Sequence, residues 1–466
     1  MKSVASLRVS LLHNGYVICF AWRSRTVKST NPEASLFTLV ITWISVVPLL
    51  VMASQGGFSF EQGSSNTLVG YAATGIISPI NANEALFMKV QRAVLYLVCI
   101  LMMAPFLRTI AREILQNKLI VSILSLALLS VIWSQNAWTS LLSATALTLD
   151  VCFGVYLLKR FSGNKLLKLL LLTGIIAAAA SLLLVFVFPE YGLQGKKLQS
   201  LGAWQGIFQH KNACGSVLTI FLLPVFFVRI KSRFGMLLRC IYGAILVFII
   251  AMTRSTGAWL VCAACVVFIL GMRLFARFSN RAAVAVGMLI TAFVLCASYV
   301  GFQYSDLLMY LMGKDPTMTG RTVIWAVLLP SILKHPLLGY GYMAFWQGGL
   351  KGESANAAIA LNWPGISYSE SGIIDLWLGL GAVAVVLFLL LFCLAARDAI
   401  YCFSRGATPI AMWFTSMLFY IAVSNIAAGQ ILQPSSLGCI LQIVAFVGLG
   451  QERRRTRTES QPGALA

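Results

Sequence analysis

Charged residues are scarce in this sequence, and the acidic ones are far fewer than the basic ones. Of its 466 residues, 11% are charged, 14 are Asp or Glu, and 35 are Lys or Arg. A soluble globular domain usually contains about a quarter charged residues, so the composition excludes that class. The hydrophobic fraction of 59% indicates a polytopic membrane protein instead.

The motifs that usually mark metal sites and disulfide frameworks are also missing. The 11 cysteines are scattered through apolar runs rather than paired in polar loops, so neither a disulfide framework nor a zinc site is expected. No Asp-x-Asp pair occurs, and the chain has 3 histidines. No period typical of a solenoid or a coiled coil is visible either.

The net charge of +21 has a different meaning in a membrane protein than in a soluble one. In a soluble chain it would suggest nucleic acid as a partner. Basic residues of membrane proteins instead collect in cytoplasmic loops and beside anionic lipids. We therefore expect membrane lipids as partners and do not expect nucleic acid.

Long apolar runs fill most of the chain. A spanning helix needs about 20 predominantly apolar residues, and a helix satisfies its own backbone hydrogen bonds. Twelve segments meet this criterion, at approximately 35–54, 91–107, 119–134, 140–158, 168–188, 215–229, 237–253, 257–273, 282–301, 373–395, 408–428 and 434–450. We predict an all-α polytopic membrane protein with about 12 transmembrane helices. A large periplasmic loop, 302–372, is expected to contain short helices.

Three parts follow from these runs. Residues 1–30 are a basic arm that we expect on the cytoplasmic side. Residues 31–450 form the membrane domain. Residues 451–466 are a short, basic cytoplasmic tail that we expect to be disordered.

The distribution of basic residues sets the orientation. If the amino terminus is cytoplasmic, the inward-facing segments hold 25 of the 35 Lys and Arg residues. The positive-inside rule then predicts that both termini are cytoplasmic. The outward face receives the loops 55–90, 189–214 and 302–372 and the short turn around Arg254, and the candidate site residues lie in or next to these segments.

A cluster of hydrogen-bond donors lies where the chain re-enters the membrane at the sixth predicted span. His210, Lys211 and Asn212 follow one another there, and Lys supplies three donors and a full positive charge, which suit a phosphate. On residue types alone, an ordinary cluster of interface side chains is the more common case. Arg254 has the same two interpretations, which are a bidentate contact with phosphate and a side chain that reaches the headgroups.

The large outward loop contains the next candidate. Thr317 or Thr319 can cap a helix that runs from about Gly320 to Lys334. Arg321 lies in its first turn, beside backbone amides that also favour an anion. Because most faces of this helix are apolar, we expect it to lie against the bilayer surface.

Aromatic side chains follow Arg321 in the same loop. Trp325 lies in the predicted helix, and Tyr340 and Tyr342 lie in a turn rich in Pro and Gly. Sugars stack on aromatic rings, so the three residues are candidates for substrate binding. Core packing would use the same rings, and this alternative stays open.

Two carboxylates have positions that suggest a role. Glu370 lies between two serines just before the tenth predicted span, where it could serve as a general base. As a single acid it could equally have no role. Asp150 lies near the middle of the fourth predicted span, where acids are candidates for function, but it could equally hydrogen-bond a neighbouring helix.

Three stretches together resemble the superfamily of bacterial O-antigen ligases and O-antigen and exopolysaccharide polymerases. They are Gly-x-Phe-x-His-Lys-Asn-x-x-Gly at 206–215, Thr-Gly-Arg-Thr-x-x-Trp at 319–325, and Pro-Leu-Leu-Gly-Tyr-Gly-Tyr at 336–342. Order, spacing and hydropathy agree with the superfamily over residues 90–450.

The resemblance implies a function. Such proteins are integral-membrane glycosyltransferases that act outside the bacterial inner membrane on sugars carried by undecaprenyl diphosphate. By this resemblance, Arg254 and Arg321 hold the diphosphate leaving group while an acceptor hydroxyl attacks the anomeric carbon, without a metal or another cofactor. The implied partners are an undecaprenyl-diphosphate-linked oligosaccharide, a chain-length regulator and a flippase.

One departure from the family pattern bears on the mechanism. Ligases of the superfamily place a catalytic histidine at the end of the large loop, where this chain has Glu370-Ser371-Gly372. We therefore expect Glu370 to act as the base and the chain to polymerise repeat units, as exopolysaccharide polymerases of the succinoglycan type do. One alternative is a ligase that transfers glycan to lipid A core or another acceptor. The other is a flippase or transporter of lipid-linked oligosaccharide, which the nearly charge-free spans disfavour.

Overall fold

The computed structural model describes residues 32–54, 82–161, 163–194, 202–275, 321–347, 352–362, 366, 368–427 and 431–459. The chain divides into two units, Met1–Trp43 and Ile44–Ala466. Of the first unit, residues 32–43 are described, and they form the beginning of helix α1 (Pro32–Ala53). The predicted arm, 1–30, lies outside these ranges.

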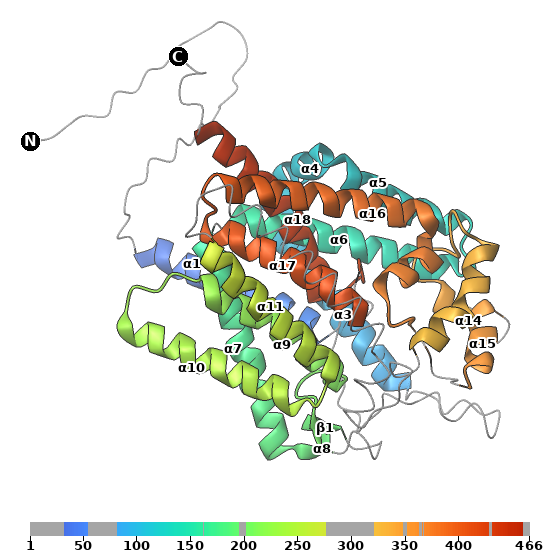
Figure 1. Ribbon diagram of the computed structural model, residues 1–466, viewed down its shortest axis with the longest axis horizontal. Helices are drawn as coiled ribbons and strands as arrows, with labels where there is room; N and C mark the ends of the chain where they lie inside the picture. Colours follow the sequence, from blue (N-terminus) through green and yellow to red (C-terminus); the bar gives the residue numbers. More distant parts are fainter. Residues whose placement is uncertain are drawn as a thin grey trace, which may run out of the picture. The chain divides into compact units, whose positions relative to one another are not determined.

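The second unit is helical (Figure 1). After α1, the α-helices within the described ranges are α3 (Ala82–Met103), α4 (Leu107–Gln116), α5 (Lys118–Leu129), α6 (Ala137–Arg160), α7 (Asn164–Val187), α8 (Pro189–Gly192), α9 (Lys211–Phe227), α10 (Arg233–Met252), α11 (Thr256–Phe275), α14 (Arg321–Lys334), α15 (Glu353–Ala360), α16 (Gly372–Ser404), α17 (Pro409–Ala427) and α18 (Leu437–Glu459). Short 3-10 helices are η1 (Ala104–Phe106), η2 (Ser130–Ile132) and η5 (Phe345–Gln347). Two strands, β1 (Leu193–Gln194) and β2 (Ala203–Trp204), pair in antiparallel fashion. The predicted all-α fold is confirmed.

Most of the predicted membrane segments coincide with helices. Eleven of the twelve overlap α1, α3, α5, α6, α7, α9, α10, α11, α16, α17 and α18, and the remaining segment, 282–301, is not among the residues described. In the part of the chain that the structure describes, six helices are long and apolar enough to cross a membrane. The polytopic membrane fold is thus confirmed, and twelve crossings stay a prediction.

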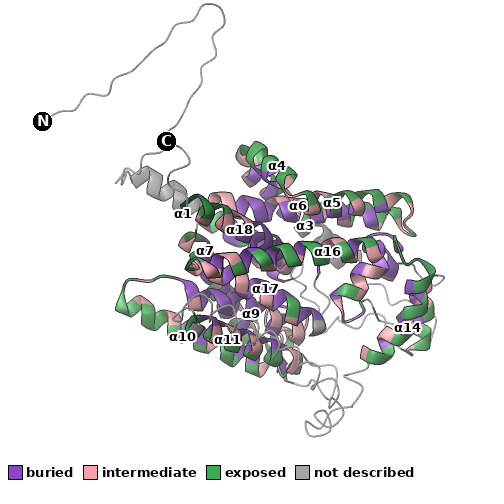
Figure 2. Cartoon of the chain, turned by 45° about the horizontal axis from the view of Figure 1, so that its top comes forward, coloured by how far each residue is buried: buried purple, intermediate pink, exposed green. Residues whose placement is uncertain are grey.

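Helix α18 forms the centre of one group of helices. Leu437 and residues 439–449 are buried, and α18 contacts α6, α16 and α17 (Figure 2). Gly154 of α6 allows a close approach, because a Cβ there would lie 3.1 Å from the carbonyl oxygen of Ile440. Small residues at helix contacts are typical of membrane proteins, where close backbone packing holds helices together.

Helices α7, α9, α10 and α11 form a second group, and α17 joins the two. Helix α17 contacts α9 and α11 on one side and α16 and α18 on the other, and Figure 1 shows it between α11 and α18. The hydroxyl of Tyr420 on α17 donates to the backbone oxygen of Ser216 on α9 at 3.1 Å. The two groups are therefore parts of one packed bundle.

At one end of the bundle, which we call the basic end, two buried acids form ion pairs with basic side chains. Glu113 accepts hydrogen bonds from Lys159 at 2.6 Å and from Arg454 at 2.5 Å. Asp398 is paired with Arg453 at 2.9 Å and with its neighbour in the chain, Arg397. These pairs join α4, α6, α16 and α18 where α6, α16 and α18 end.

The prediction of a disordered tail is wrong for residues 451–459, because α18 continues to Glu459. Arg and Glu are good helix formers, so the loss of apolar character does not end the helix. Arg453 and Arg454 also bind the two buried acids, and Arg455 pairs with Glu459 one turn later at 3.0 Å. Residues 460–466 are not described.

Helix α16 is interrupted at Gly381, and another segment completes its backbone bonding. Gly381 has φ 74° and ψ −176°, which is a conformation available to glycine and strained for other residues. The segment 336–342 lies against this break. The Tyr340 amide donates to Leu378 at 2.8 Å, and the Ala382 amide donates to Pro336 at 2.8 Å. Non-helical backbone at membrane depth needs such protein partners, since lipid offers none.

The same segment is also bonded to the turn before α6. The indole of Trp133 donates to the Leu338 oxygen at 3.1 Å, and the amide of Tyr342 donates to the Ser130 hydroxyl at 3.1 Å. The φ of Gly341 is 100°, and a Cβ at this position would overlap the Ser134 side chain. The Gly-Tyr-Gly-Tyr motif therefore fits a tight backbone site between η2 and the break in α16.

Asp150 holds a turn next to α18. Its carboxylate accepts from the Ser435 amide at 2.7 Å and from the Tyr96 hydroxyl at 3.2 Å. The Tyr96 hydroxyl also contacts the Ser435 hydroxyl at 2.8 Å. These bonds favour the structural interpretation of this intramembrane acid, as a group that binds a neighbouring segment.

The opposite end of the bundle contains the starts of α6, α9, α11 and α16 and the end of α17. We call it the loop end and define it by residues 130–137, 210–212, 253–256, 321, 336–347, 368–372 and 431–436. It includes residues from three of the segments that the sequence predicts to face outward, 189–214, the turn around Arg254 and 302–372.

Candidate active site

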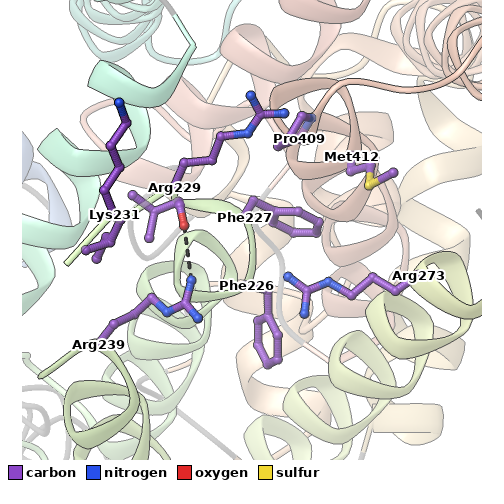
Figure 3. Close-up of a pocket in the computed structure, with 10 residues that line it drawn as sticks. Phe226, Phe227, Arg229, Lys231, Arg239, Arg273, Pro409 and Met412 are labelled. Carbon is purple, nitrogen blue, oxygen red and sulfur yellow. Dashed lines mark hydrogen bonds between the residues drawn. The ribbon is translucent and has the colours of Figure 1, made fainter. Parts of the chain in front are cut away.

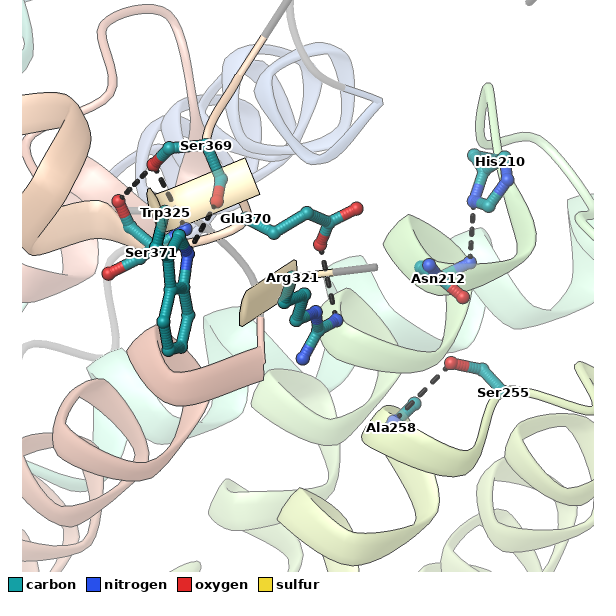
Figure 4. Close-up of polar contacts among 9 residues, drawn as sticks. All are labelled: His210, Asn212, Ser255, Ala258, Arg321, Trp325, Ser369, Glu370 and Ser371. Carbon is teal, nitrogen blue, oxygen red and sulfur yellow. Dashed lines mark hydrogen bonds and ion pairs between the residues drawn. The ribbon is translucent and has the colours of Figure 1, made fainter. Parts of the chain in front are cut away.

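Arg321 and Glu370 form an ion pair at the loop end (Figure 4). The Arg321 Nη2 atom lies 3.2 Å from the Glu370 Oε2 atom, and each side chain is 16% exposed. Arg321 is the first residue of α14, and Glu370 lies two residues before α16. Two residues that are 49 positions apart in the chain thus meet in a largely buried contact that solvent still reaches.

A hydrophobic cluster positions α14 against the start of α16. Ile324, Leu328 and Ile332 of α14 are buried together with Phe345 and Leu378. The apolar residues recur at intervals of four, which places them on one face of the helix. At the far end of α14, Lys334 binds Glu353 of α15 at 2.6 Å. The helix is therefore fixed at both ends, and Arg321 begins it at a defined place.

A network of hydrogen bonds holds the segment that carries Glu370. The Trp325 indole donates to the Ser369 oxygen at 2.9 Å, as Figure 4 shows. The Ser369 amide donates to the Asp375 carboxylate at 3.0 Å, and the Trp346 indole donates to the same oxygen at 3.0 Å. Glu370 itself has φ 59°, a costly conformation that persists where surrounding bonds enforce it.

The protonation of Glu370 depends on two opposing influences. Burial raises the pKa of the Glu370 carboxyl, whereas the Arg321 guanidinium and a hydrogen bond from Tyr368 act in the opposite direction. Burial and the nearby Glu370 charge raise the pKa of Tyr368 to about 12, so this hydroxyl keeps its proton at neutral pH. A carboxyl with a raised pKa accepts a proton more readily near neutral pH.

His210, Lys211 and Asn212 lie at the start of α9. His210 caps the helix, since its Nδ1 atom accepts from the Asn212 amide at 3.1 Å (Figure 4). All three side chains are half-buried. The first amides of a helix, together with a lysine in its first turn, favour an anion. The capping bond is a structural role for His210 that the sequence did not predict.

Arg254 lies in the turn between α10 and α11. It has φ 49° and is exposed. The neighbouring Thr253 hydroxyl donates to the Ile250 oxygen at 2.7 Å, and the Trp259 indole donates to the same oxygen at 2.9 Å. Gly215 of α9 packs so closely on Ala258 that a Cβ there would overlap it. The turn of Arg254 thus lies beside the first turns of α9.

Helix α17 contacts both α9, which begins with Lys211 and Asn212, and the start of α16, which follows Glu370. Tyr420 of α17 bonds to Ser216 in the second turn of α9, and Asn425 packs against Gly372 at the start of α16. Five residues of α-helix span about 7.5 Å, so the two contacts lie near each other along α17. The structure therefore brings all three groups to the same end, with the turn of Arg254 packed on α9.

The three aromatic candidates have partners within the protein. The Tyr340 hydroxyl donates to the Ser331 oxygen at 2.9 Å, and the Tyr342 hydroxyl donates to the Leu432 oxygen. Tyr340 and Tyr342 are 6% and 3% exposed. Trp325 is half-buried and bonds to Ser369, as described above. The geometry favours core packing for the two tyrosines, and substrate contact by any of the three stays a prediction.

Sequence reasoning assigned no role to Ser369 or Asp375, although both help to hold Glu370. The signal was present, because Asp375 follows Glu370 by five residues at the start of an apolar run. Within the described ranges, no three His, Cys, Asp or Glu side chains are placed to share a metal ion. The expected independence from metals and cofactors stays a prediction.

Comparisons with known proteins bear on the same residues. The model of the O-antigen ligase family matches residues 241–389, which include Arg254, Arg321 and Glu370. The exopolysaccharide production protein ExoQ of Rhizobium meliloti (strain 1021) is 28% identical over 182 residues. This match covers 38% of the present chain and 41% of ExoQ, which is less than half of either protein. Part of the chain is thus similar to the O-antigen ligase family, and part is similar to an exopolysaccharide production protein.

Proposed function

We propose that this chain is a membrane glycosyltransferase that polymerises oligosaccharide repeat units carried on undecaprenyl diphosphate. The family match and the relative support a polymerase or ligase type of function in polysaccharide biosynthesis. The observation that carries the proposal is the Arg321–Glu370 pair. It joins a cation suited to a departing diphosphate with a carboxylate suited to the proton of an attacking hydroxyl.

The arginines stabilise the leaving group in this proposal. The acceptor hydroxyl attacks the anomeric carbon of the donor, and the bond between that carbon and the diphosphate oxygen breaks. The diphosphate leaves with the electron pair, and guanidinium donors of Arg321 and Arg254 offset its growing charge. Lys211 and the first amides of α9 add positive potential at the same end of the bundle.

Glu370 takes the proton of the attacking hydroxyl. In the substrate-free protein, Arg321 favours the ionised carboxylate. A diphosphate that binds Arg321 competes for this cation, and the pKa of Glu370 then rises because its compensating charge is shared. Binding of the donor thus makes Glu370 a better proton acceptor at the moment when it is needed.

The proposed location is the bacterial inner membrane, with the loop end outward and both termini in the cytoplasm. The positive-inside rule supports it, because Lys159, Arg453 and Arg454 gather at the opposite end. The proposed donor is a lipid-linked oligosaccharide. A chain-length regulator and a flippase would act before or beside the polymerase.

A second candidate function is transfer of a finished glycan to lipid A core or another acceptor. The family description, O-antigen ligase, favours it, whereas Glu370 in place of a histidine and the printed name of the relative favour exopolysaccharide polymerisation. Transport is less favoured, because the intramembrane acid Asp150 is engaged with Ser435 and Tyr96.

The test is to delete the gene and to identify the lipid-linked intermediate that accumulates. A polymerase leaves single repeats on the outer side of the membrane, and this is the expected result. A ligase leaves long lipid-linked chains, and a flippase leaves repeats on the inner side. Either of the last two results would contradict the proposal. Complementation with Arg321→Ala should fail to restore polymer although the protein is inserted normally.

A further inference from the structure

A basic pocket lies at the basic end, away from the Arg321–Glu370 pair. It has a volume of about 510 Å³ and lies between the end of α9, the start of α10, the end of α11 and the start of α17 (Figure 3). Its lining includes Arg229, Lys231, Arg239 and Arg273, and none of the lining residues is acidic. Four positive charges thus border one cavity.

The two central guanidinium groups come from different helices. Figure 3 shows Arg239 of α10 and Arg273 of α11 extending toward one another across the pocket. Arg239 donates to the Val228 oxygen at 3.1 Å. The Arg273 guanidinium carbon lies 5.7 Å and 5.6 Å from the ring centres of Phe226 and Phe227. Backbone and ring contacts orient the two groups but do not cancel their charges.

Four basic residues elsewhere at this end are bound to two buried acids. Lys159 and Arg454 bind Glu113, and Arg397 and Arg453 bind Asp398. None of the ion pairs that join described residues involves the four cations of the pocket. Two guanidinium groups that converge without an acid between them repel each other, and an anion between them removes this cost.

Glu452 is an acid near the pocket in the described part of the chain. It accepts a hydrogen bond from Thr408 at 2.9 Å, and Thr408 precedes the pocket residue Pro409. Glu452 also lies 3.9 Å from Arg455. Its single negative charge, shared with Arg455, is outweighed by the four cations that line the pocket.

The surroundings of the pocket favour a lipid over a soluble anion. Exposed apolar side chains lie within one turn of the pocket residue Arg273 on α11, and they include Leu270 and Leu274. In a membrane protein such side chains face acyl chains. An occupant with a phosphate in the pocket and acyl chains on these faces matches both surfaces.

We propose that the cavity between α9, α10, α11 and α17 binds the phosphate headgroup of an anionic membrane phospholipid. Arg239 and Arg273 contact the phosphate, and Arg229 and Lys231 lie at the rim. The phenylalanine rings form the floor, and the acyl chains lie along α11. This site is separate from the proposed diphosphate site, because the two lie at opposite ends of the bundle.

The test is a titration of the full-length protein in detergent micelles with phosphatidylglycerol, followed by native mass spectrometry. The wild type should retain the lipid saturably. Arg273→Gln should weaken retention by roughly fivefold, as expected for one basic residue at an anionic headgroup. Should Arg273→Gln fail to fold, the double variant Arg229→Gln/Lys231→Gln tests the same pocket through exposed side chains.

The matched control removes two charges at the same end of the bundle. Arg108 and Arg112 are exposed on α4 and do not line the pocket. Arg108→Gln/Arg112→Gln should therefore bind the lipid like the wild type. Equal retention by the pocket variants and the wild type would overturn the proposal. Equal retention of phosphatidylcholine, or full displacement of the lipid by millimolar inorganic phosphate, would overturn it as well.

Discussion

The substitution Arg321→Gln separates two possible roles of the Arg321–Glu370 pair. If Arg321 stabilises the departing diphosphate, its loss removes a charged donor from the transition state. Loss of one such donor typically lowers kcat by about 100- to 1,000-fold, which corresponds to about 2.7–4 kcal/mol. If Arg321 only neutralises Glu370, the loss of activity should instead come from the unpaired Glu370 carboxylate, and removing that carboxylate should restore activity.

The structure sets the expected effect on stability. The pair is 3.2 Å long, and each side chain is 16% exposed. Removing one partner leaves the other with an unmet bond, at a cost of about 1–3 kcal/mol. The double variant Arg321→Gln/Glu370→Gln carries no such charge and should be more stable than Arg321→Gln alone. Its activity should stay low, because the diphosphate lacks its cation and the attacking hydroxyl lacks its proton acceptor.

Two measurements on each variant decide between the roles. Thermal unfolding of purified protein reports stability, and single-turnover transfer from a lipid-linked repeat reports the chemical step. Recovery of turnover in the double variant would refute the reasoning, since it would mean that Arg321 serves only to neutralise Glu370. Wild-type turnover in Arg321→Gln would refute it directly.

Three other predictions concern pH, backbone and topology. Burial raises the pKa of Glu370 in the folded state above its value of about 4.3 in the unfolded chain, so the wild-type protein should lose stability as pH rises from about 4.3 through the raised pKa. In thermal unfolding at several pH values, Glu370→Gln should remove this dependence of the unfolding temperature on pH. Gly381→Ala should lower the unfolding temperature more than Gly406→Ala, because both glycines have positive φ but only a Cβ at 381 would overlap Leu337; equal losses would contradict this. In intact spheroplasts, an impermeant thiol reagent should label the exposed position of Ile359→Cys above the wild-type background but not that of Arg112→Cys, and the reverse pattern would invert the proposed orientation.

Hydropathy predicted the positions of the helices well because burial in lipid acts on each segment separately. Helix α14 was also predicted, since apolar spacing is a local signal, whereas the predicted caps Thr317 and Thr319 lie outside the described residues. The end of α18 was missed because its stabilising partners, Glu113 and Asp398, come from distant parts of the chain. Hydropathy reports where a segment is apolar, whereas these ion pairs decide where the helix ends.

The site was predictable in its residues but not in its contacts. Arg321 and Glu370 were both candidates, yet their pairing spans 49 positions and depends on how α14 packs against α16. The break at Gly381 shows the same limit. Its backbone bonds are met by the segment 336–342, so the Gly-Tyr-Gly-Tyr motif, which suggested rings for a sugar, also serves to complete a helix.

Direct binding of a polyprenyl diphosphate to the purified protein tests the central claim most directly. The titration compares the wild type with Arg321→Gln and Arg254→Gln, with Arg108→Gln/Arg112→Gln, which lies outside both proposed sites, as the control. We predict that both loop-end variants bind the ligand at least about tenfold more weakly, as expected for a lost charge-assisted contact, while the control binds like the wild type. Equal affinity in the wild type and both loop-end variants would contradict the claim that the loop end binds the diphosphate.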